Sequence, residues 1–254
     1  MAVLSSGLGD PVGVVLDGLG LLFSNETPGS GTVGRVPVQG GQAVLLASNQ
    51  SKANGIAATS TAVYWTEFIA NGNVMSADKY DGGGLTTVAA MQAQPSRIAV
   101  NSDAIFWTNQ GAGVVTCPLG STSCAPQVID ATSGCVPFGI TLDTHYVYWT
   151  CNGSGAVMRA PLGGGGSVVL AQHRLAPVGI AVDATDVYWA ESGGGNVATC
   201  PINGCGPSSP TLVAQGQAVP WNVALDDSSV YWTNEGAAGA QNAGSVMKAT
   251  KRRH

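Results

Sequence analysis

Tyr64-Trp65-Thr66 decides the fold, because versions of this triplet recur along the chain. The copies stand 40 to 43 residues apart and read Leu22-Phe23-Ser24, Tyr64-Trp65-Thr66, Phe106-Trp107-Thr108, Tyr148-Trp149-Thr150, Tyr188-Trp189-Ala190 and Tyr231-Trp232-Thr233. A fixed period of this length is typical of an array of repeated supersecondary units. We therefore take the repeat, rather than any single motif, as the unit of the fold.

Each repeat predicts four short β-strands. In the fifth repeat, Gly179-Ile180-Ala181-Val182-Asp183 is followed by a polar turn, Val187-Tyr188-Trp189, a glycine-rich loop and Asn196-Val197-Ala198. Short runs of β-branched and aromatic residues between turns indicate strands. Helical repeats are excluded because Gly or Pro interrupts nearly every ten residues and no apolar spacing near 3.6 is present. The sequence therefore predicts an all-β fold, a six-bladed β-propeller of four-stranded antiparallel blades of about 42 residues.

Two further patterns agree with this fold. The triplets do not alternate apolar and polar residues, so both faces of their strands are expected to be buried between neighbouring sheets. The first strand closes on an Asp or Asn in five of the six repeats, and such side chains bond their own backbone in tight turns. We interpret these residues as hairpin formers: Asp17, Asn101, Asp143, Asp183 and Asp226.

The repeats account for almost all of the 254 residues, which predicts a single domain. The last repeat stops at its third strand, and residues 1–10 match the missing outer strand, so the amino terminus is expected to close the ring. The expected segments are 1–10 (outer strand of blade six), 11–53, 54–95, 96–137, 138–177 and 178–220 (blades one to five), and 221–250 (the rest of blade six).

The net charge of the chain limits the kinds of partner that it can bind. The net charge is -5 with only ten Lys and Arg residues, whereas nucleic-acid binding requires a basic stripe. No stretch approaches 18 consecutive apolar residues, so no membrane span is expected. We expect a monomer that binds a small molecule, a glycan or a protein, with no nucleic-acid partner.

The six cysteines form three local pairs, which are Cys117 with Cys124, Cys135 with Cys151, and Cys200 with Cys205. The first and third pairs bracket the same hairpin of two different repeats, as disulfides would. Zinc ligation and free thiols are the alternatives, but the CxxC spacing of zinc sites is absent. Disulfides predict an extracellular or periplasmic location.

The repeats resemble known propeller blades. Tyr148-Trp149-Thr150 followed by Val157-Met158-Arg159-Ala160-Pro161-Leu162 is similar to the YWTD blades of low-density-lipoprotein-receptor-like propellers, as is Ile180-Ala181-Val182-Asp183 followed by Val187-Tyr188-Trp189. The layout is also similar to NHL propellers and to streptogramin B lyase. The resemblance covers essentially the whole chain and implies six blades, and such folds include binding modules and enzymes. It transfers no catalytic residue.

The position after each triplet departs from the YWTD pattern and is the first candidate site. It is occupied by Asn25, Glu67, Asn109, Cys151, Glu191 and Asn234. Two carboxylates and three amides at one mouth of the fold resemble the oxygen-rich channel of calcium-dependent lactonase propellers, and such oxygens suit Ca²⁺. The alternative is that these side chains cap neighbouring loops.

The second candidate site lies where the repeat usually has Gly before the first strand. Arg97 replaces this glycine in the third repeat and would either clamp an anionic ligand or pair with Glu67. Phe138 and Trp221 stand just before this position and would form a sugar or peptide platform or plug the channel. Glu26, Phe68 and Glu235 are further rim residues without an assigned role.

Motifs for nucleophilic or zinc-dependent catalysis are missing from the sequence, including G-x-S-x-G and HExxH. The leading hypothesis is therefore a non-catalytic binding propeller without a cofactor. The alternative is a divalent-cation-dependent lyase or lactonase that uses Glu67, Glu191 and the ring amides as ligands, with Ca²⁺ as the expected ion. A structural module in a larger assembly is a third hypothesis.

Overall fold

The computed structural model describes residues 4, 6–206, 209–236 and 244–251. These residues form 23 strands and no helix. The chain divides into two compact units, Met1–Gln127 and Val128–His254. No helix in the described ranges is long and apolar enough to cross a membrane.

The first unit builds three antiparallel sheets in which the strands follow one another in chain order. The first sheet contains β1 (Pro11–Asp17), β2 (Gly20–Asn25), β3 (Gly31–Val36) and β4 (Val44–Gln50). The second contains β5 (Ala53–Ala58), β6 (Ala62–Glu67), β7 (Ala70–Asp78) and β8 (Thr86–Ala93). The third contains β9 (Pro95–Val100), β10 (Ala104–Asn109), β11 (Gly113–Pro118) and β12 (Gln127–Asp130), which begins at the last residue of this unit.

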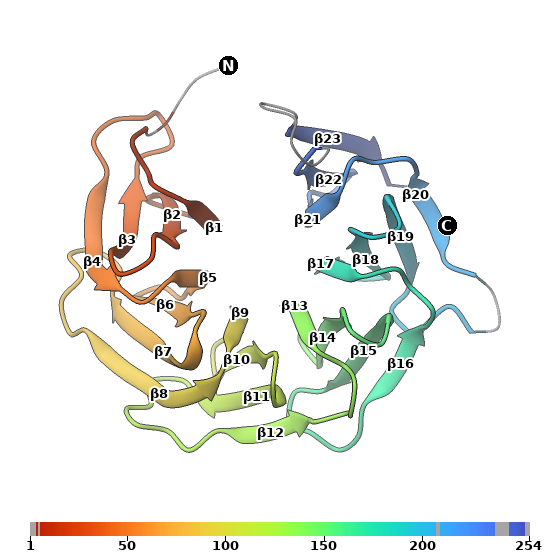
Figure 1. Ribbon diagram of the computed structural model, residues 1–254, viewed down its shortest axis with the longest axis horizontal. Coiled ribbons are helices and arrows are strands. Elements are labelled where there is room, and N and C mark those ends of the chain that lie inside the picture. Colours follow the sequence, from red (N-terminus) through yellow and green to blue (C-terminus); the bar gives the residue numbers. More distant parts are fainter. Residues whose placement is uncertain (1–3, 5, 207–208, 237–243, 252–254) are drawn as a thin grey trace. The chain divides into compact units, whose positions relative to one another are not determined.

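The second unit builds three more sheets with the same strand order. They contain β13 (Pro137–Leu142), β14 (Tyr146–Cys151), β15 (Ala156–Pro161) and β16 (Val168–Ala171), then β17 (Pro177–Val182), β18 (Asp186–Glu191), β19 (Asn196–Pro201) and β20 (Thr211–Ala214), and finally β21 (Pro220–Leu225), β22 (Ser229–Asn234) and β23 (Ser245–Thr250). Within each unit the first strands of successive sheets contact one another, as β1, β5 and β9 do in Figure 1.

Six successive antiparallel sheets of this kind define a six-bladed β-propeller and confirm the predicted fold class. The sheets are called blades from here on, numbered in chain order. Blade six has three strands among the described residues. Residues 1–3 and 5, which belong to the predicted outer strand of that blade, lie outside the described residues, so ring closure stays a prediction.

The hairpins between first and second strands form as the sequence predicts. Oδ1 of Asp17 accepts hydrogen bonds from the N–H groups of Leu19 and Gly20, at 2.8 and 3.0 Å. The other four predicted hairpin formers make the same pair of bonds to the second and third residues that follow them. In blade two the acceptor is the hydroxyl of Thr59. A short polar side chain therefore closes each of these turns.

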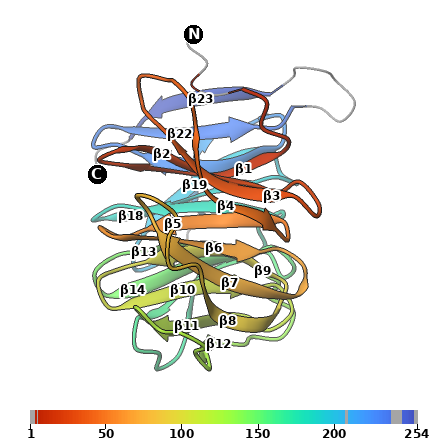
Figure 2. The ribbon, with the colours of Figure 1, turned by 90° about the vertical axis from the view of Figure 1, so that its left-hand side faces the viewer.

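The triplets form the core. Trp65, Trp107, Trp149 and Trp189 are fully buried, and every residue of β18 is buried. Trp65 packs in a cluster with Leu22 and Val33 of the preceding blade, and the clusters that contain Trp107, Trp189 and Trp232 are built alike. Figure 2 shows the sheets of the first unit from the side, as successive layers. The absence of alternation in the triplets thus reflects burial on both faces.

The last residue of the triplet fastens neighbouring blades. Oγ1 of Thr66 accepts the N–H of Gly55 in its own blade at 2.9 Å and donates to the carbonyl of Ser96 in the next blade at 2.5 Å. Thr150 donates in the same way to the carbonyl of Val178, at 2.7 Å. One hydroxyl therefore satisfies a buried donor and a buried acceptor on two first strands.

Gly55, whose N–H bonds Thr66, lies where the first strands of two neighbouring blades approach each other closely. A Cβ on Gly55 would lie 2.5 Å from the carbonyl oxygen of Ser96 and 2.9 Å from Cα of Arg97. Only glycine allows two backbones to approach this far without displacement. The equivalent residue in blade three is Arg97, which replaces the glycine of the repeat.

Candidate functional site

Four of the five segments between blades share one backbone turn. Two residues of this turn, three positions apart, have a left-handed backbone conformation. They are Asn49 and Lys52 before blade two, and His173 and Ala176 before blade five. The turns before blades three and six repeat this pattern. The residue after the first left-handed position, here called the linker residue, lies 15 positions before the tryptophan of the next blade.

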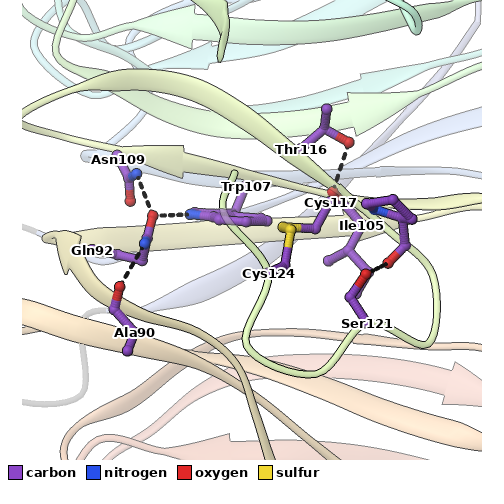
Figure 3. The surroundings of a disulfide bond; sticks show 10 residues. Ala90, Gln92, Ile105, Trp107, Asn109, Thr116, Cys117, Ser121 and Cys124 are labelled. Atoms are coloured by element: carbon purple, nitrogen blue, oxygen red, sulfur yellow. Dashed lines mark hydrogen bonds between the residues drawn. A yellow bond between two sulfur atoms is a disulfide. The ribbon is translucent and has the colours of Figure 1, made fainter. Parts of the chain in front are cut away.

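In three blades the linker residue is a glutamine that bonds the indole. Oε1 of Gln92 accepts from Nε1 of Trp107 at 3.3 Å and from Nδ2 of Asn109 at 2.9 Å, while its own amide donates to the carbonyl of Ala90 (Figure 3). Gln217 makes the same contacts with Trp232 and Asn234. Gln50 bonds Trp65 at 3.1 Å. These amides, of which those of Gln50 and Gln92 are buried, join each segment to the next blade.

Blades four and five replace the glutamine by other chemistry. The linker residue of blade five is Arg174, whose Nε lies 3.0 Å from Oε1 of Glu191. The same oxygen accepts from Nε1 of Trp189, also at 3.0 Å, and Glu191 is completely buried. In blade four the turn differs: the residue 15 positions before Trp149 is Gly134, itself left-handed, and a disulfide joins the adjoining Cys135 to Cys151.

The residues of the ring predicted after the triplets are buried, and they bond their own blades and the segments that precede them. Oε1 of Glu67 accepts the N–H of Ser51 at 2.8 Å, and Oε2 accepts from Nδ2 of Asn73 at 2.7 Å. Oδ1 of Asn25 accepts the N–H of Asp10. Together with the contacts of Asn109, Glu191 and Asn234, these bonds favour the capping alternative. A ligand role for these five residues stays a prediction.

A polar cluster lies in the first unit and joins three blades. It consists of Glu26 from blade one, Lys52 and Asn54 from the start of blade two, and Arg97 from β9. Nη1 of Arg97 donates to Oδ1 of Asn54 at 2.9 Å, and Nδ2 of Asn54 donates to Oε2 of Glu26 at 3.1 Å. Nζ of Lys52 lies 3.8 Å from the other oxygen of Glu26.

Electrostatics single out Arg97 within the polar cluster. Burial of its guanidinium lowers the pKa of Arg97 to about 10, and the charge of Glu26 opposes this shift. Asn54 is almost completely buried, whereas the side chain of Lys52 is 40% exposed. Glu26 is therefore the carboxylate whose charge acts on Arg97, while Glu67, the alternative partner, bonds Ser51 and Asn73 instead.

An aromatic pair lies in the second unit. The rings of Phe138 on β13 and Trp221 on β21 meet edge to face, with centroids 5.4 Å apart and planes at 79°. Both side chains are half-buried, while Val178 on the intervening β17 is almost completely buried. Trp221 differs from the other five tryptophans, which are at most 3% exposed. The structure thus brings together two aromatic residues that the sequence pattern indicates as candidates.

The aromatic pair and Asn54 hold the same position in their blades. Asn54 follows Ala53, which pairs with Glu67, and Phe138 follows Pro137, which pairs with Cys151. Trp221 follows the equivalent Pro220. This position carries a polar side chain in blades two and three, Asn54 and Ser96, and an aromatic or apolar one in the second unit.

The three predicted disulfides are present. Cys117–Cys124 and Cys200–Cys205 each start at the end of a third strand and close a hairpin of seven and five residues (Figure 3). Cys135–Cys151 spans 16 residues and joins the segment before blade four to the end of β14. All six cysteines are therefore paired.

Sequence reasoning missed the linker residues and the role of Glu26. The linker residues have a signal in the sequence, which is the constant spacing of 15 residues between Gln50, Gln92 or Gln217 and the following triplet tryptophan. Among the residues with a described placement, no group of three or more His, Cys, Asp and Glu side chains could hold a metal ion.

The fold and these sites define a protein of the β-propeller class. A scan against models of protein families found no match, and a search of the curated proteins found none either. Solved structures share the fold. A chain from a nidogen/laminin complex is 21% identical with a TM-score of 0.66, and the match covers 84% of each chain.

Two lyase structures are also similar. A virginiamycin B lyase from Staphylococcus aureus is 15% identical with a TM-score of 0.75, over 96% of this chain and 85% of that one. A streptogramin B lyase has the same identity and TM-score over 100% of this chain and 86% of that chain. These likenesses confirm the YWTD and streptogramin-lyase type of propeller suspected from the triplets, and they concern the fold alone.

Proposed function

We propose that this protein is a secreted or periplasmic β-propeller that binds a glycan, peptide or small molecule without catalysis. The observation that carries this proposal is the aromatic pair. Phe138 and Trp221 are half-buried on first strands, at positions where their neighbour Val178 is buried. Aromatic faces that stay accessible next to loops are suited to stack on sugars and apolar side chains.

The state of the buried carboxylates supports a binding role over an enzymatic one. A general acid or base must have oxygen atoms within reach of a substrate. Both oxygens of Glu67 accept hydrogen bonds, from Ser51 before blade two and from Asn73 within it, and Glu191 is buried against Arg174 and Trp189. The proposed binding function requires neither a metal ion nor another cofactor, so added Ca²⁺ or EDTA should leave the unfolding temperature unchanged.

The disulfides support an oxidising compartment, because thiols in the cytosol are kept reduced. One structural neighbour comes from a nidogen/laminin complex, which supports a protein or peptide ligand as one possibility to test. Two other structural neighbours are lyases, so the alternative function to measure is turnover of a lactone or cyclic depsipeptide.

The test screens glycan and peptide arrays with the wild type, with Trp221→Ala and with Tyr80→Ala as the matched control. Tyr80 is an aromatic residue of the first unit, 49% exposed and remote in sequence from the aromatic pair. We expect Trp221→Ala to weaken binding at least tenfold and Tyr80→Ala to leave it unchanged. A bound ligand should also protect the fluorescence of Trp221 from quenching by acrylamide, because the other tryptophans are already buried.

Two results would contradict the proposal. One is a ligand whose affinity is the same for Trp221→Ala and the wild type. The other is metal-dependent turnover of lactones or cyclic depsipeptides by the purified protein, which would establish the enzymatic alternative.

A further inference from the structure

Blade four lacks a backbone hydrogen bond that other blades make after their second strand. In blades three and five, the N–H groups of Gly111 and Gly193 donate to carbonyl groups of the preceding segment, each at 3.2 Å. Gly153 holds the same position in blade four, between β14 and β15, and is exposed. Its N–H has no hydrogen-bond partner among the described residues. The bond is lost where the preceding segment has a different turn, with Gly134 left-handed.

The residue before this N–H is an asparagine whose side chain is not engaged. Asn152 is half-buried, and its own N–H donates to the carbonyl of Val136 at 3.0 Å. Its carboxamide makes no hydrogen bond to any residue that the structure describes. Glycine has no Cβ to hinder an approach to its nitrogen. The nitrogen of Gly153 is therefore accessible to the side-chain carbonyl carbon of Asn152.

The chain has four Asn-Gly pairs, and in the other three the glycine N–H is bonded. These bonded donors are Gly55 at 2.9 Å, Gly72 at 3.0 Å and Gly204 at 2.8 Å. A bonded amide exchanges its proton with solvent only when the structure opens locally. Asn54 and Asn203 are also held through their side chains. Asn71 is exposed, so the bonded N–H of the next residue is what separates it from Asn152.

We propose that Asn152 is a site of spontaneous deamidation. Hydroxide removes the amide proton of Gly153, and the nitrogen attacks Cγ of Asn152. The new bond closes a five-membered imide as the bond from Cγ to Nδ2 breaks, and Nδ2 takes up a proton and leaves as ammonia. Water then opens the imide at one of its two carbonyl carbons, which gives aspartate or isoaspartate. The reaction consumes only water and requires no change of oxidation state.

The modification changes both the charge and the backbone of the turn. Either product places a carboxylate where blade four has a neutral amide, whereas blade one already has Glu26 at the same position. Isoaspartate also adds the side-chain methylene to the main chain, directly after Cys151 of the disulfide. The site goes beyond the proposed binding function and does not depend on the aromatic pair.

The test follows the folded wild type by peptide mapping with mass spectrometry after incubation in mildly acidic and mildly alkaline buffers. We expect aspartate and isoaspartate to accumulate at Asn152 at least tenfold faster than at Asn71. The rate should rise with pH, because hydroxide removes the amide proton. The reference is the reduced and denatured chain, in which all four Asn-Gly pairs are free of structure and should react at similar rates.

Asn152→Gln is the diagnostic variant, because glutamine stands at the same position in blade three as Gln110 and would have to close a less favourable six-membered ring. Asn71→Gln is the matched control. Isoelectric focusing of the aged wild type should show acidic species that Asn71→Gln keeps and Asn152→Gln lacks.

Three results would overturn the proposal. In the folded protein these are a rate at Asn71 that equals the rate at Asn152, and a rate at Asn152 that is independent of pH. The third is the formation of the same acidic species by Asn152→Gln as by the wild type. If Asn152→Gln fails to fold, the peptide map of the wild type decides alone. None of these results affects the proposal for the aromatic pair.

Discussion

The segments between blades differ in chemistry from the first unit to the second. In the first unit the linker residues are Gln50 and Gln92, and both bond a buried indole through an uncharged amide. In the second unit, blade six keeps a glutamine, Gln217, but blade five uses the ion pair of Arg174 and Glu191, and blade four uses a disulfide. The backbone turn is nevertheless repeated at positive φ in both units. The fold therefore requires a linker at this place but accepts several kinds.

The first strands show the same contrast. The position of Asn54 in the first unit belongs to a polar cluster, whereas the equivalent positions of Phe138 and Trp221 form an aromatic pair in the second unit. Residues that obey the repeat, such as the triplet tryptophans, are buried. Deviations from the repeat at accessible positions are thus the places to look for ligands.

The largest effect is expected from breaking the ion pair of blade five. Arg174→Met leaves the carboxylate of Glu191 buried without its cation, which should lower the free energy of unfolding by about 3 to 5 kcal/mol. Urea unfolding followed by circular dichroism measures this loss. The matched variant Gln50→Met removes an uncharged partner of Trp65 and should cost about 1 to 3 kcal/mol. Equal losses in both variants would show that the charged linker is no stronger than the amide.

An intermediate effect is expected from the disulfide of blade four. Replacing Cys135 and Cys151 by Ala opens a loop of 16 residues and should cost about 3 kcal/mol, because the unfolded chain regains entropy. Removing Cys200–Cys205, which closes only five residues, should cost about 1 kcal/mol less. Denaturant midpoints of the two double variants test the order. A larger loss from the shorter loop would contradict this account of the blade-four linker.

The smallest effect is expected from Gln92→Leu in blade three. The substitution leaves Nε1 of Trp107 and one amide of Asn109 buried without acceptors, at a cost of about 1 to 3 kcal/mol. Near-ultraviolet circular dichroism would report a changed environment of the indole. A loss below about 0.5 kcal/mol would mean that the amide linker is dispensable. Blade four already has a comparable buried donor, since Nε1 of Trp149 has no hydrogen-bond partner among the residues that the structure describes.

Local features of the fold were predictable from the sequence. The hairpin closed by Asp17 depends on a side chain that bonds the second and third residues after it, so its signal lies within a few positions. The disulfides were predictable for a similar reason, since Cys200 and Cys205 bracket one hairpin. The burial of the triplets followed from their lack of alternation.

The contacts of the candidate sites were less predictable, because they join residues from different blades. Arg97 was recognised as an exception to the glycine pattern, but its position relative to Asn54 and Glu26 depends on how three first strands stack. The contact of Phe138 with Trp221 crosses an entire intervening strand. Glu67 and Glu191 were identified as a set, and their hydrogen bonds show that each is engaged in its own blade.

The sequence by itself determined the number of repeats, the strands in each, the hairpin turns and the pairing of the cysteines. All of these depend on residues close together in the chain or on a period that can be counted. Only the tertiary structure decided that the linker residues bond the tryptophans, that Glu26 rather than Glu67 acts on Arg97, and that two aromatic residues meet on β13 and β21. The physical reason is that these contacts depend on the packing of one sheet against the next, and the repeat period carries no information about which side chains then come within bonding distance.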